Sequence, residues 1–343
     1  MRALQLTWPG SAASFPLRMV ELPDPEPLPD ELVLDVTACA VCRTDLQIVE
    51  GDLDEHRSPV VPGHQAVGRV ERVGPEVRGW QVGDRAGVAW LGSTCGTCGF
   101  CQGGRENLCT TAGFTGWDRD GGFATRLAVR ADFALRLPEG FADLAAAPLL
   151  CGGVIGYRAL KVSGIEPGGR LGLYGFGASA LLALQVARHW GCEVHVRTRS
   201  RRGQQQATAL GAASVGDYDD PAPPLGAAVS FAPTGDVVVA ALRGLERGGT
   251  VAVNAIHLDR MPEFSYDLLW SERGIRSVAN FTRADAREFL ALAAEIGLET
   301  SVQTFPLEGG GEALRRLAAG ELEGTAVLVT GDDDDDGAGR SPG

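Results

Sequence analysis

A glycine-rich turn in the second half of the chain constrains the fold more than any other feature. The turn reads GFGASA (175–180). It follows a short apolar run (170–175) and precedes LLALQVARHWG, whose apolar residues have helical spacing and end at Gly191. Beyond it, the sequence predicts strands at 192–198, 227–232, 249–255 and 275–280, and a helix at 236–249. Strands that alternate with helices predict a parallel, doubly wound sheet.

The turn matches the pattern G-x-G-x-x-A. Gly175 suits the tight turn, Gly177 permits the close approach of a pyrophosphate, and Ala180 serves helix–strand packing. The phosphates would lie at the N-terminus of the helix that follows. A pair of glycines alone is weak evidence, because any tight turn can contain one. This turn, however, lies between a predicted strand and a predicted helix, in a region where strands and helices alternate. That context predicts dinucleotide binding.

A second motif places four cysteines within fifteen positions. Cys95, Cys98, Cys101 and Cys109 form a C-x2-C-x2-C-x7-C array in a glycine-rich loop, and thiolates at this spacing can surround zinc. An iron–sulfur cluster is the first alternative, but its fourth cysteine would come sooner and precede a proline, whereas Thr110 follows here. Unrelated thiols are the second alternative. Four thiolates fill the coordination sphere of zinc, so the array predicts a structural site rather than a catalytic one.

Three further residues have the chemistry of a catalytic zinc site. Cys42, His64 and Cys151 supply two thiolates and an imidazole, which leaves the fourth position open for water or substrate. Asp45 is close enough in sequence to accept a hydrogen bond from a ligating imidazole. Each residue alone is weak evidence, since a single cysteine is most often a small buried hydrophobe.

Length, charge and the two ends of the chain limit the function further. A chain of 343 residues suggests two domains, and a net charge of −13 argues against a nucleic-acid surface. The run DDDDD (332–336) and the residues after it predict a solvated, disordered tail. We find no apolar run of about 18 residues that would span a membrane, and no signal peptide at the N-terminus. These features predict a cytoplasmic protein, in which clustered cysteines hold metals rather than form disulfides.

Together these motifs resemble the zinc-dependent alcohol dehydrogenases of the medium-chain dehydrogenase/reductase superfamily. The resemblance rests on CRTDL at Cys42, GHQAVG at His64, the four-cysteine array, LLCGG at Cys151 and GFGASA, and it extends to about Gly331. It implies an α/β fold that combines a GroES-like β-barrel catalytic domain with a Rossmann domain, a doubly wound parallel sheet. The implied division is a catalytic domain (1–150) with a structural zinc lobe (94–110), a Rossmann domain (151–281), a return to the catalytic domain (282–331) and the acidic tail (332–343).

The resemblance also implies roles for single residues. Cys42, His64 and Cys151 would bind the catalytic zinc, and the four-cysteine array the structural zinc, so that each chain holds two zinc ions. Thr44 would begin a proton relay and Asp45 would orient His64. Trp90 matches an aromatic residue of the alcohol pocket, although a core tryptophan is an equally simple interpretation. The implied cofactor contacts are Arg43, Gly175, Gly177, Ala180, Thr198, Arg199 and Ser200.

Two positions depart from the family pattern. Gln65 follows the histidine, where glutamate is common, and a neutral amide is a poorer metal ligand. Gln47 stands where a histidine often ends the relay, and glutamine cannot exchange a proton near neutral pH. Both changes leave the zinc ligands intact and bear on ligand exchange at the zinc and on the release of the proton.

The choice of cofactor depends on the end of the second predicted strand. NAD enzymes usually have a carboxylate there, about 20 residues after the glycines, but Thr198 occupies this position, and no acid occurs between Glu193 and Asp217. The surrounding basic residues are Arg197, Arg199, Arg201 and Arg202. Guanidinium groups can bind a 2′-phosphate, so the segment favours NADP(H) over NAD(H). A solvated basic loop is the alternative.

The sequence thus predicts a zinc-dependent alcohol dehydrogenase or aldehyde reductase that acts on a small alcohol or aldehyde. The resemblance also implies a homodimer or homotetramer, and the sequence predicts no nucleic-acid or membrane partner. The alternatives are a polyol dehydrogenase, a zinc-free quinone reductase of the same superfamily, and a non-catalytic zinc-binding protein. The first commonly has a carboxylate at the position of Cys151, and the second would not need both zinc sites.

Overall fold

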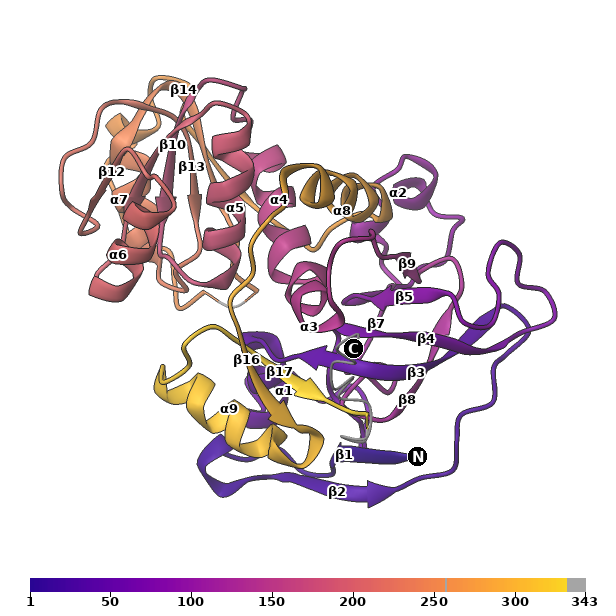
Figure 1. The fold of residues 1–343 in the computed structure, drawn as a ribbon. Helices are drawn as coiled ribbons and strands as arrows, with labels where there is room; N and C mark the ends of the chain where they lie inside the picture. Colours follow the sequence, from indigo (N-terminus) through magenta and orange to yellow (C-terminus); the bar gives the residue numbers. More distant parts are fainter. Residues whose placement is uncertain (257, 332–343) are drawn as a thin grey trace, which may run out of the picture.

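The computed structural model describes residues 1–256 and 258–331. The acidic tail predicted at 332–343 therefore lies outside the described residues. Two sheets dominate the structure (Figure 1): a parallel sheet formed by the middle of the chain, and a larger sheet to which both ends of the described chain contribute. Among the described residues, no helix is long and apolar enough to cross a membrane.

The middle of the chain forms a six-stranded parallel sheet. Its strand order is β12-β11-β10-β13-β14-β15, and every neighbouring pair is parallel. This is the order of a doubly wound dinucleotide-binding sheet, so the predicted fold class is confirmed. The strands are β10 (Arg170–Tyr174), β11 (Glu193–Arg197), β12 (Ser214–Gly216), β13 (Leu225–Ser230), β14 (Leu245–Val253) and β15 (Gly274–Ser277).

Helices cover both faces of this sheet. On β13, Ala227 and Val229 lie in one hydrophobic core, whereas Ala228 between them lies in a second core, because successive residues of a strand point to opposite faces. The first core contains residues of α4 and α5, and the second contains residues of α7. The helices are α4 (Gly152–Ser163), α5 (Ala178–His189), α6 (Arg201–Ala209), α7 (Gly235–Gly244) and α8 (Arg283–Ile296).

The structure corrects two sequence predictions in this region. The helix predicted at 236–249 ends at Gly244, and β14 begins at Leu245, because the residues from Leu245 onward pair with β13. The segment interpreted as a basic loop is partly helical, since α6 begins at Arg201. The Ser200 hydroxyl caps α6 by accepting a hydrogen bond from the Gly203 N–H at 3.1 Å.

The ends of the chain build the second sheet, of order β16-β17-β3-β4-β5-β9, with β8 also paired to β3. Its strands are β3 (Glu31–Ala40), β4 (Ala66–Val73), β5 (Arg85–Val88), β8 (Arg126–Arg130), β9 (Leu135–Arg136), β16 (Val302–Pro306) and β17 (Thr325–Val329). Two small ribbons, β1 (Arg2–Leu6) with β2 (Leu17–Glu21) and β6 (Leu91–Ser93) with β7 (Gly113–Phe114), lie outside it.

The remaining helices are short, and all but the 3-10 helix between β14 and β15 lie outside the parallel sheet. The α-helices are α1 (Arg43–Glu50), α2 (Gly99–Gln102), α3 (Asp143–Ala146) and α9 (Gly310–Ala319). The 3-10 helices are Ala12–Ser14, Glu106–Leu108, Ala147–Leu150, Tyr266–Leu268 and Leu307–Gly309.

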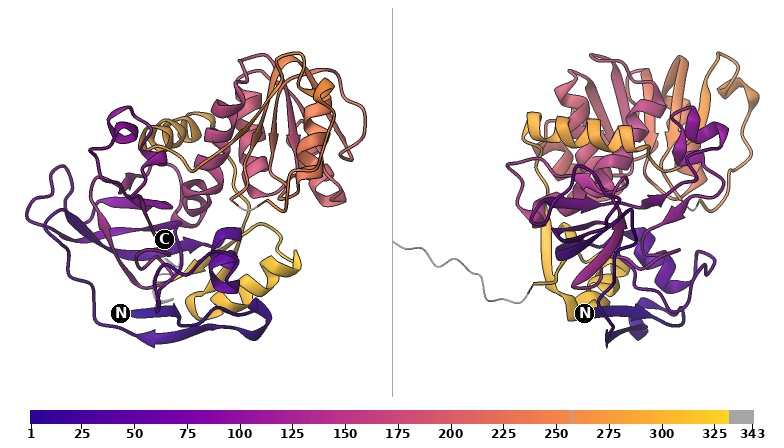
Figure 2. Two further views of the ribbon diagram at one scale, coloured as in Figure 1. Left: turned by 180° about the vertical axis from the view of Figure 1, so that it is seen from behind. Right: turned by 90° about the vertical axis from the view of Figure 1, so that its right-hand side faces the viewer.

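The chain passes out of the parallel sheet and returns to the larger one. After β15, residues 278–282 lead into α8, and β16 and β17 then complete the larger sheet, with β17 antiparallel to β3. Figure 1 shows β16 and β17 beside β3, and both views in Figure 2 show the yellow helix α9 close to the indigo N-terminal segment. This return is consistent with the predicted domain division, whose boundaries stay a prediction.

Candidate active site

The structure brings Cys42, His64 and Cys151 together. One ligand atom from each lies within 4.8 Å of the other two, and the Cys42 Sγ is 3.3 Å from the His64 Nε2. Cys42 immediately precedes α1, His64 lies just before β4, and Cys151 immediately precedes α4. His64 and Cys151 lie 22 and 109 positions after Cys42 in the sequence. The three residues thus meet where α1 and α4 begin, close to the start of β4.

Asp45 organises this cluster with both carboxylate oxygens. Its Oδ1 lies 3.0 Å from the His64 Nδ1 and also accepts a hydrogen bond from the Gly63 N–H at 3.2 Å. Its Oδ2 accepts from the backbone N–H of Cys42 at 2.9 Å and so caps α1. Asp45 is fully buried, so it fixes the histidine ring with the Nε2 directed at the two sulfurs.

The donor set fits a zinc ion. Zinc lies about 2.3 Å from sulfur and about 2.0–2.1 Å from a histidine nitrogen, so neighbouring ligands of a tetrahedral site are roughly 3.3–3.8 Å apart. The 3.3 Å between Cys42 and His64 agrees with this spacing. The Cys151 sulfur and burial raise the pKa of the Cys42 thiol well above its usual value. A divalent cation between the sulfurs would offset this cost, because it stabilises thiolates.

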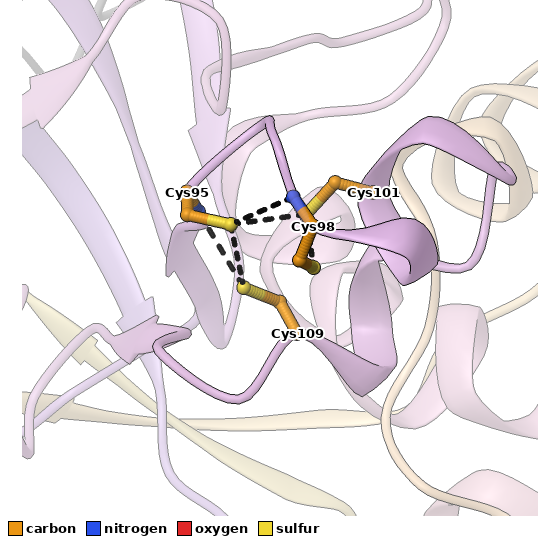
Figure 3. A group of neighbouring side chains, drawn as sticks. All are labelled: Cys95, Cys98, Cys101 and Cys109. Carbon is orange, nitrogen blue, oxygen red and sulfur yellow. Dashed lines mark hydrogen bonds between the residues drawn. The ribbon is translucent and has the colours of Figure 1, made fainter.

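The four-cysteine array also converges, in the loop around α2. The sulfurs of Cys95, Cys98, Cys101 and Cys109 face one another (Figure 3), and all lie within 4.8 Å. The sulfur–sulfur distances are 3.9 Å for Cys95–Cys101, 3.5 Å for Cys98–Cys101 and 3.6 Å for Cys109–Cys95. These are the edges of a tetrahedron of the size zinc requires.

Backbone N–H groups favour the ionised form of part of this array. Those of Thr97 and Cys98 lower the pKa of Cys95 to about 5, and the N–H of Cys95 lowers that of Cys109. Burial, with a contribution from Cys98, instead raises the pKa of Cys101 to about 11. These N–H groups therefore favour the thiolate at Cys95 and Cys109, and the thiolate is the form that binds metal.

The relay positions lie on α1. Thr44 is in its first turn, and its backbone N–H donates to the Cys42 Sγ at 3.3 Å. Gln47 is buried on the same helix, and its Oε1 has no hydrogen-bond partner among the described residues. Gln65 is also buried, and its amide donates to the Ala40 carbonyl at 3.4 Å. Arg43 is the first residue of α1 and is exposed.

An aromatic cluster adjoins His64. Of its members, only Trp90 was predicted from the sequence to lie near the site. Trp90 is 8% exposed and lies edge-on to the His64 ring, with 5.0 Å between centroids. Phe114 and Trp117 stack on Trp90 at 5.1 and 5.7 Å, and His56 stacks on Trp117 at 3.7 Å. Trp90 therefore packs in the core and also touches the candidate metal site. Only the local density of aromatic residues at 114–117 could have indicated this cluster.

The glycine-rich turn joins β10 to α5 as predicted. Gly175 has a φ of +84°, and a Cβ there would lie 3.0 Å from the Ala232 nitrogen, so both the angle and the space favour glycine. Gly177 precedes α5, and a Cβ there would meet nothing within 4 Å among the described residues. Ala180 is fully buried. The turn therefore leaves open space at a helix N-terminus, where a pyrophosphate fits.

The basic segment divides into inward and outward side chains. Arg197 is 2% exposed and donates to the carbonyls of Asp220 and Pro221, so it adds nothing to an outward basic surface. Thr198 follows β11 and is buried, and Arg199 is exposed with its guanidinium 5.4 Å from the centre of the Tyr218 ring.

The remaining arginines of this segment lie on α6. Arg201 and Arg202 are both exposed, and Arg202 donates to the Leu322 carbonyl at 2.9 Å. Of these exposed arginines, Arg199 is the nearest in sequence to Thr198.

The chain is similar in sequence to known alcohol dehydrogenases. Residues 28–139 match the alcohol dehydrogenase GroES-like domain. A probable alcohol dehydrogenase, AdhA, of Mycobacterium tuberculosis (strain CDC 1551 / Oshkosh) is 49% identical, over 96% of this chain and 97% of the relative. An alcohol dehydrogenase of Geobacillus stearothermophilus is 33% identical, over 91% of this chain and 96% of the relative.

Solved structures share the fold along nearly the whole chain. A cinnamyl alcohol dehydrogenase from Sorghum bicolor has a TM-score of 0.87 and 26% identity, covering 95% of this chain and 97% of the other. A zinc- and cobalt-bound thermostable alcohol dehydrogenase from Pyrobaculum aerophilum has a TM-score of 0.87, with 96% and 99% covered. Its identity of 24% supports the fold alone.

Proposed function

This chain belongs to the medium-chain alcohol dehydrogenase family, and we propose that it is a zinc-dependent alcohol dehydrogenase or aldehyde reductase. It transfers hydride between a small alcohol or aldehyde and a nicotinamide cofactor, with NADP(H) preferred to NAD(H). The observation that carries the proposal is the three-ligand cluster of Cys42, His64 and Cys151, whose ligand atoms lie within 4.8 Å of one another. Three ligands leave the fourth position of a tetrahedral site open, which is typical of catalytic zinc.

The residues around the cluster have separate tasks. Zinc bound there supplies Lewis-acid chemistry toward the oxygen of the alcohol or aldehyde. Asp45 holds His64 in one tautomer and one orientation through the 3.0 Å contact with Nδ1. The Thr44 hydroxyl, two residues after Cys42, would accept a hydrogen bond from the alcohol and donate its own proton onward as the alcohol proton transfers to it. Gln47 cannot exchange a proton, so the proton passes from Thr44 to water or to another group.

The aromatic cluster gives the site its apolar wall. Trp90 packs edge-on against His64, and Phe114 and Trp117 extend the aromatic surface away from the histidine. The buried Trp90 ring and the partly buried rings of Phe114 and Trp117 would reduce the access of water to the metal site, which strengthens electrostatic interactions with the reacting oxygen. The carbon chain of the substrate would lie against these rings.

The cofactor would bind along the carboxyl edge of the parallel sheet. The open space beside Gly177 holds the pyrophosphate at the N-terminus of α5. Thr198 cannot repel a 2′-phosphate as a carboxylate would, and Arg199 is exposed beside it. A charge-assisted hydrogen bond from Arg199 to that phosphate supports the preference for NADP(H).

A substrate panel with both cofactors tests the proposal. Purified protein is mixed with primary alcohols and NADP⁺ or NAD⁺, or with aldehydes and NADPH or NADH, and the nicotinamide absorbance is followed. We expect turnover in both directions and a higher kcat/KM with NADP(H). A protein that binds two zinc ions but oxidises or reduces none of the panel with either cofactor would contradict the proposed activity.

A further inference from the structure

A buried polar contact joins the four-cysteine loop to the segment that connects the two sheets. Glu106 and Asn107 lie between the third and fourth cysteines and are only 7% and 8% exposed. The Asn107 amide donates to the Ala279 carbonyl at 2.7 Å, and the Glu106 Oε1 accepts from the backbone N–H of Arg283 at 3.0 Å. These contacts span 172 and 177 residues of sequence. Both Figure 1 and Figure 2 show α8 beside the loop of α2.

The segment 278–282, which we call the crossover, has an unusual backbone where the loop holds it. Asn280 has a φ of +60°, in the left-handed region that only glycine, asparagine and aspartate visit readily. Its Oδ1 accepts from the N–H of Phe281 at 2.9 Å, which stabilises this conformation locally. The crossover therefore bends tightly at Asn280. The preceding residue, Ala279, is the one whose carbonyl accepts the hydrogen bond from the Asn107 amide.

Two buried polar atoms at this contact lack a partner among the described residues. One is the Oδ1 of Asn107, an acceptor, and the other is the Nδ2 of Asn280, a donor. Buried polar atoms are almost always hydrogen-bonded, so each such atom requires an explanation. The first belongs to the amide that donates to Ala279, and the second belongs to the residue that follows Ala279.

The crossover continues from the carboxyl end of the parallel sheet. The Val278 N–H donates to the Val253 carbonyl at 3.0 Å, so the crossover begins beside the carboxyl end of β14. Each half of a sheet with this strand order binds one nucleotide of a dinucleotide, outside the carboxyl ends of the strands. Because β13, β14 and β15 form the second half, the crossover borders the place of the second nucleotide.

We propose that Glu106 and Asn107 are positioning residues through which the four-cysteine loop fixes the crossover and so raises the affinity for the nicotinamide nucleotide. The inference rests on the dinucleotide binding proposed above. The loop needs no contact with the nucleotide, because the effect passes through Ala279 and Arg283. It is a coupling between two sites, and such coupling is reciprocal: the bound nucleotide must stabilise the loop as much as the loop stabilises the bound nucleotide.

The first test measures cofactor affinity rather than turnover. The Kd of NADPH and of NADH is measured by fluorescence titration for wild type, Asn107→Leu and Arg105→Ala. Asn107→Leu keeps the volume but removes the amide, and we expect its Kd for the preferred cofactor to rise at least about fivefold. Arg105 is an exposed neighbour in the same loop, and its guanidinium packs on the Phe100 ring at 5.4 Å. We expect Arg105→Ala to bind like wild type.

Three results would separate the possible failures. If wild type binds neither cofactor, the proposed function itself is wrong. If wild type binds and Asn107→Leu binds equally tightly, the inference is wrong and the function stands. If Arg105→Ala loses as much affinity as Asn107→Leu, the loop acts through its general stability, and the assigned role of Asn107 is wrong.

A second measurement uses wild type alone. Reciprocal coupling requires that saturating cofactor slow amide hydrogen exchange at residues 105–109, although these residues lie in the loop and not at the glycine-rich turn. Exchange at 105–109 that is identical with and without bound cofactor would overturn the inference. This measurement holds even if Asn107→Leu fails to fold.

Discussion

Asp45 shows how much of the site depends on one side chain. One oxygen contacts the imidazole of His64, and the other caps the N-terminus of α1. The same side chain therefore orients a candidate zinc ligand and fixes the start of a helix. The sequence indicated the first role, because Asp45 lies three residues after Cys42. The second role follows the same spacing, since a carboxylate at the third helical position reaches back to the capping residue. The capping role depends on local geometry, whereas the contact with His64 joins residues 19 positions apart, and only the motif around Cys42 indicated it.

Other residue-scale features were not predictable, because they arise between distant segments. The stacking of Trp117 on Trp90 joins residues 27 positions apart in two loops. The inward direction of Arg197 is set by carbonyls beyond β12, which no pattern around Arg197 reveals. The convergence of Cys42, His64 and Cys151 was expected from resemblance, and spacing alone could not predict it.

The first prediction concerns the catalytic ligand Cys42. Cys42→Ser keeps an oxygen that can accept the Thr44 N–H and cap α1, but a hydroxyl is a poor zinc ligand. We expect turnover to fall below detection while the unfolding temperature changes little, and bound zinc to drop by one ion per chain. The control is Cys192→Ser, a buried thiol outside both cysteine sets. Full activity of Cys42→Ser would contradict the assignment.

The second prediction concerns Arg199. A charge-assisted hydrogen bond to a 2′-phosphate contributes about 1.5–3 kcal/mol. Arg199→Ala should therefore raise the KM for NADPH about ten- to a hundredfold, at about 1.4 kcal/mol per decade, and leave that for NADH nearly unchanged. Steady-state titrations with both cofactors at one salt concentration measure this, with Arg201→Ala as the control on α6. If Arg199→Ala raised the KM for NADPH and for NADH equally, or if the wild type preferred NADH, Arg199 would be a solvated surface residue.

At the scale of single elements, the start of α8 concentrates buried charge. Asp285 is fully buried and caps the helix by accepting from the N–H and hydroxyl of Thr282 at 2.9 and 2.8 Å. Arg158 donates to the same carboxylate at 3.2 Å, and Lys161 lies 2.9 Å from its other oxygen. Burial opposes the charge on this carboxylate, but these partners outweigh it and hold the pKa of Asp285 below its ordinary value.

The third prediction follows from that lowered pKa. A carboxylate with a lowered pKa in the folded state stabilises the protein above its unfolded pKa of about 4 and loses that contribution as the pH falls through the folded value. Asp285→Asn should thus lower the free energy of unfolding by about 2 kcal/mol at pH 7, with the difference shrinking below about pH 4. Urea unfolding across this pH range tests it, with the exposed Glu288→Gln as the control. A difference independent of pH would contradict the role of charge.

The fourth prediction concerns the four-cysteine loop as an element. Structural zinc contributes folding free energy, because the four thiolates are brought together only in the folded loop and the metal therefore binds the folded state. Cys98→Ala should lower the thermal unfolding temperature or the soluble yield, whereas kcat at saturating substrate should change less than in Cys42→Ser. If Cys98→Ala kept its stability and lost all turnover, the two zinc sites would have the opposite roles.

Helix and strand limits illustrate what element-scale patterns can resolve. The turn at 175–180 and its flanking strand and helix were predictable, because periodicity and glycine placement act locally. The end of α7 was not, because the residues from Leu245 onward take their conformation from pairing with β13. The start of α6 depended on one Ser200 hydroxyl among basic residues that suggested a loop.

On the scale of the whole molecule, the two cysteine-containing clusters predict a fixed metal content. They have four and three ligands, so purified protein that has not met a chelator should contain two zinc ions per chain. Elemental analysis provides the fifth prediction. Iron in place of zinc, or one zinc in fully active enzyme, would contradict it. Extended dialysis against a chelator should remove activity before it unfolds the protein, because the three-ligand site has an open position.

The pairing of β17 with β3 has a consequence for how the chain is made. A ribosome releases residues 31–40 long before residues 325–329, so β3 emerges well before this neighbour. All strands of the parallel sheet, by contrast, come from one continuous segment, residues 170–277. A domain that is continuous in sequence can fold as a unit during synthesis. The larger sheet must therefore finish last, although its first strands are translated first. Until then β3 lacks its β17 partner, and an unpaired strand edge invites association with other chains. Chaperones that shield nascent chains would be needed most at this stage of synthesis.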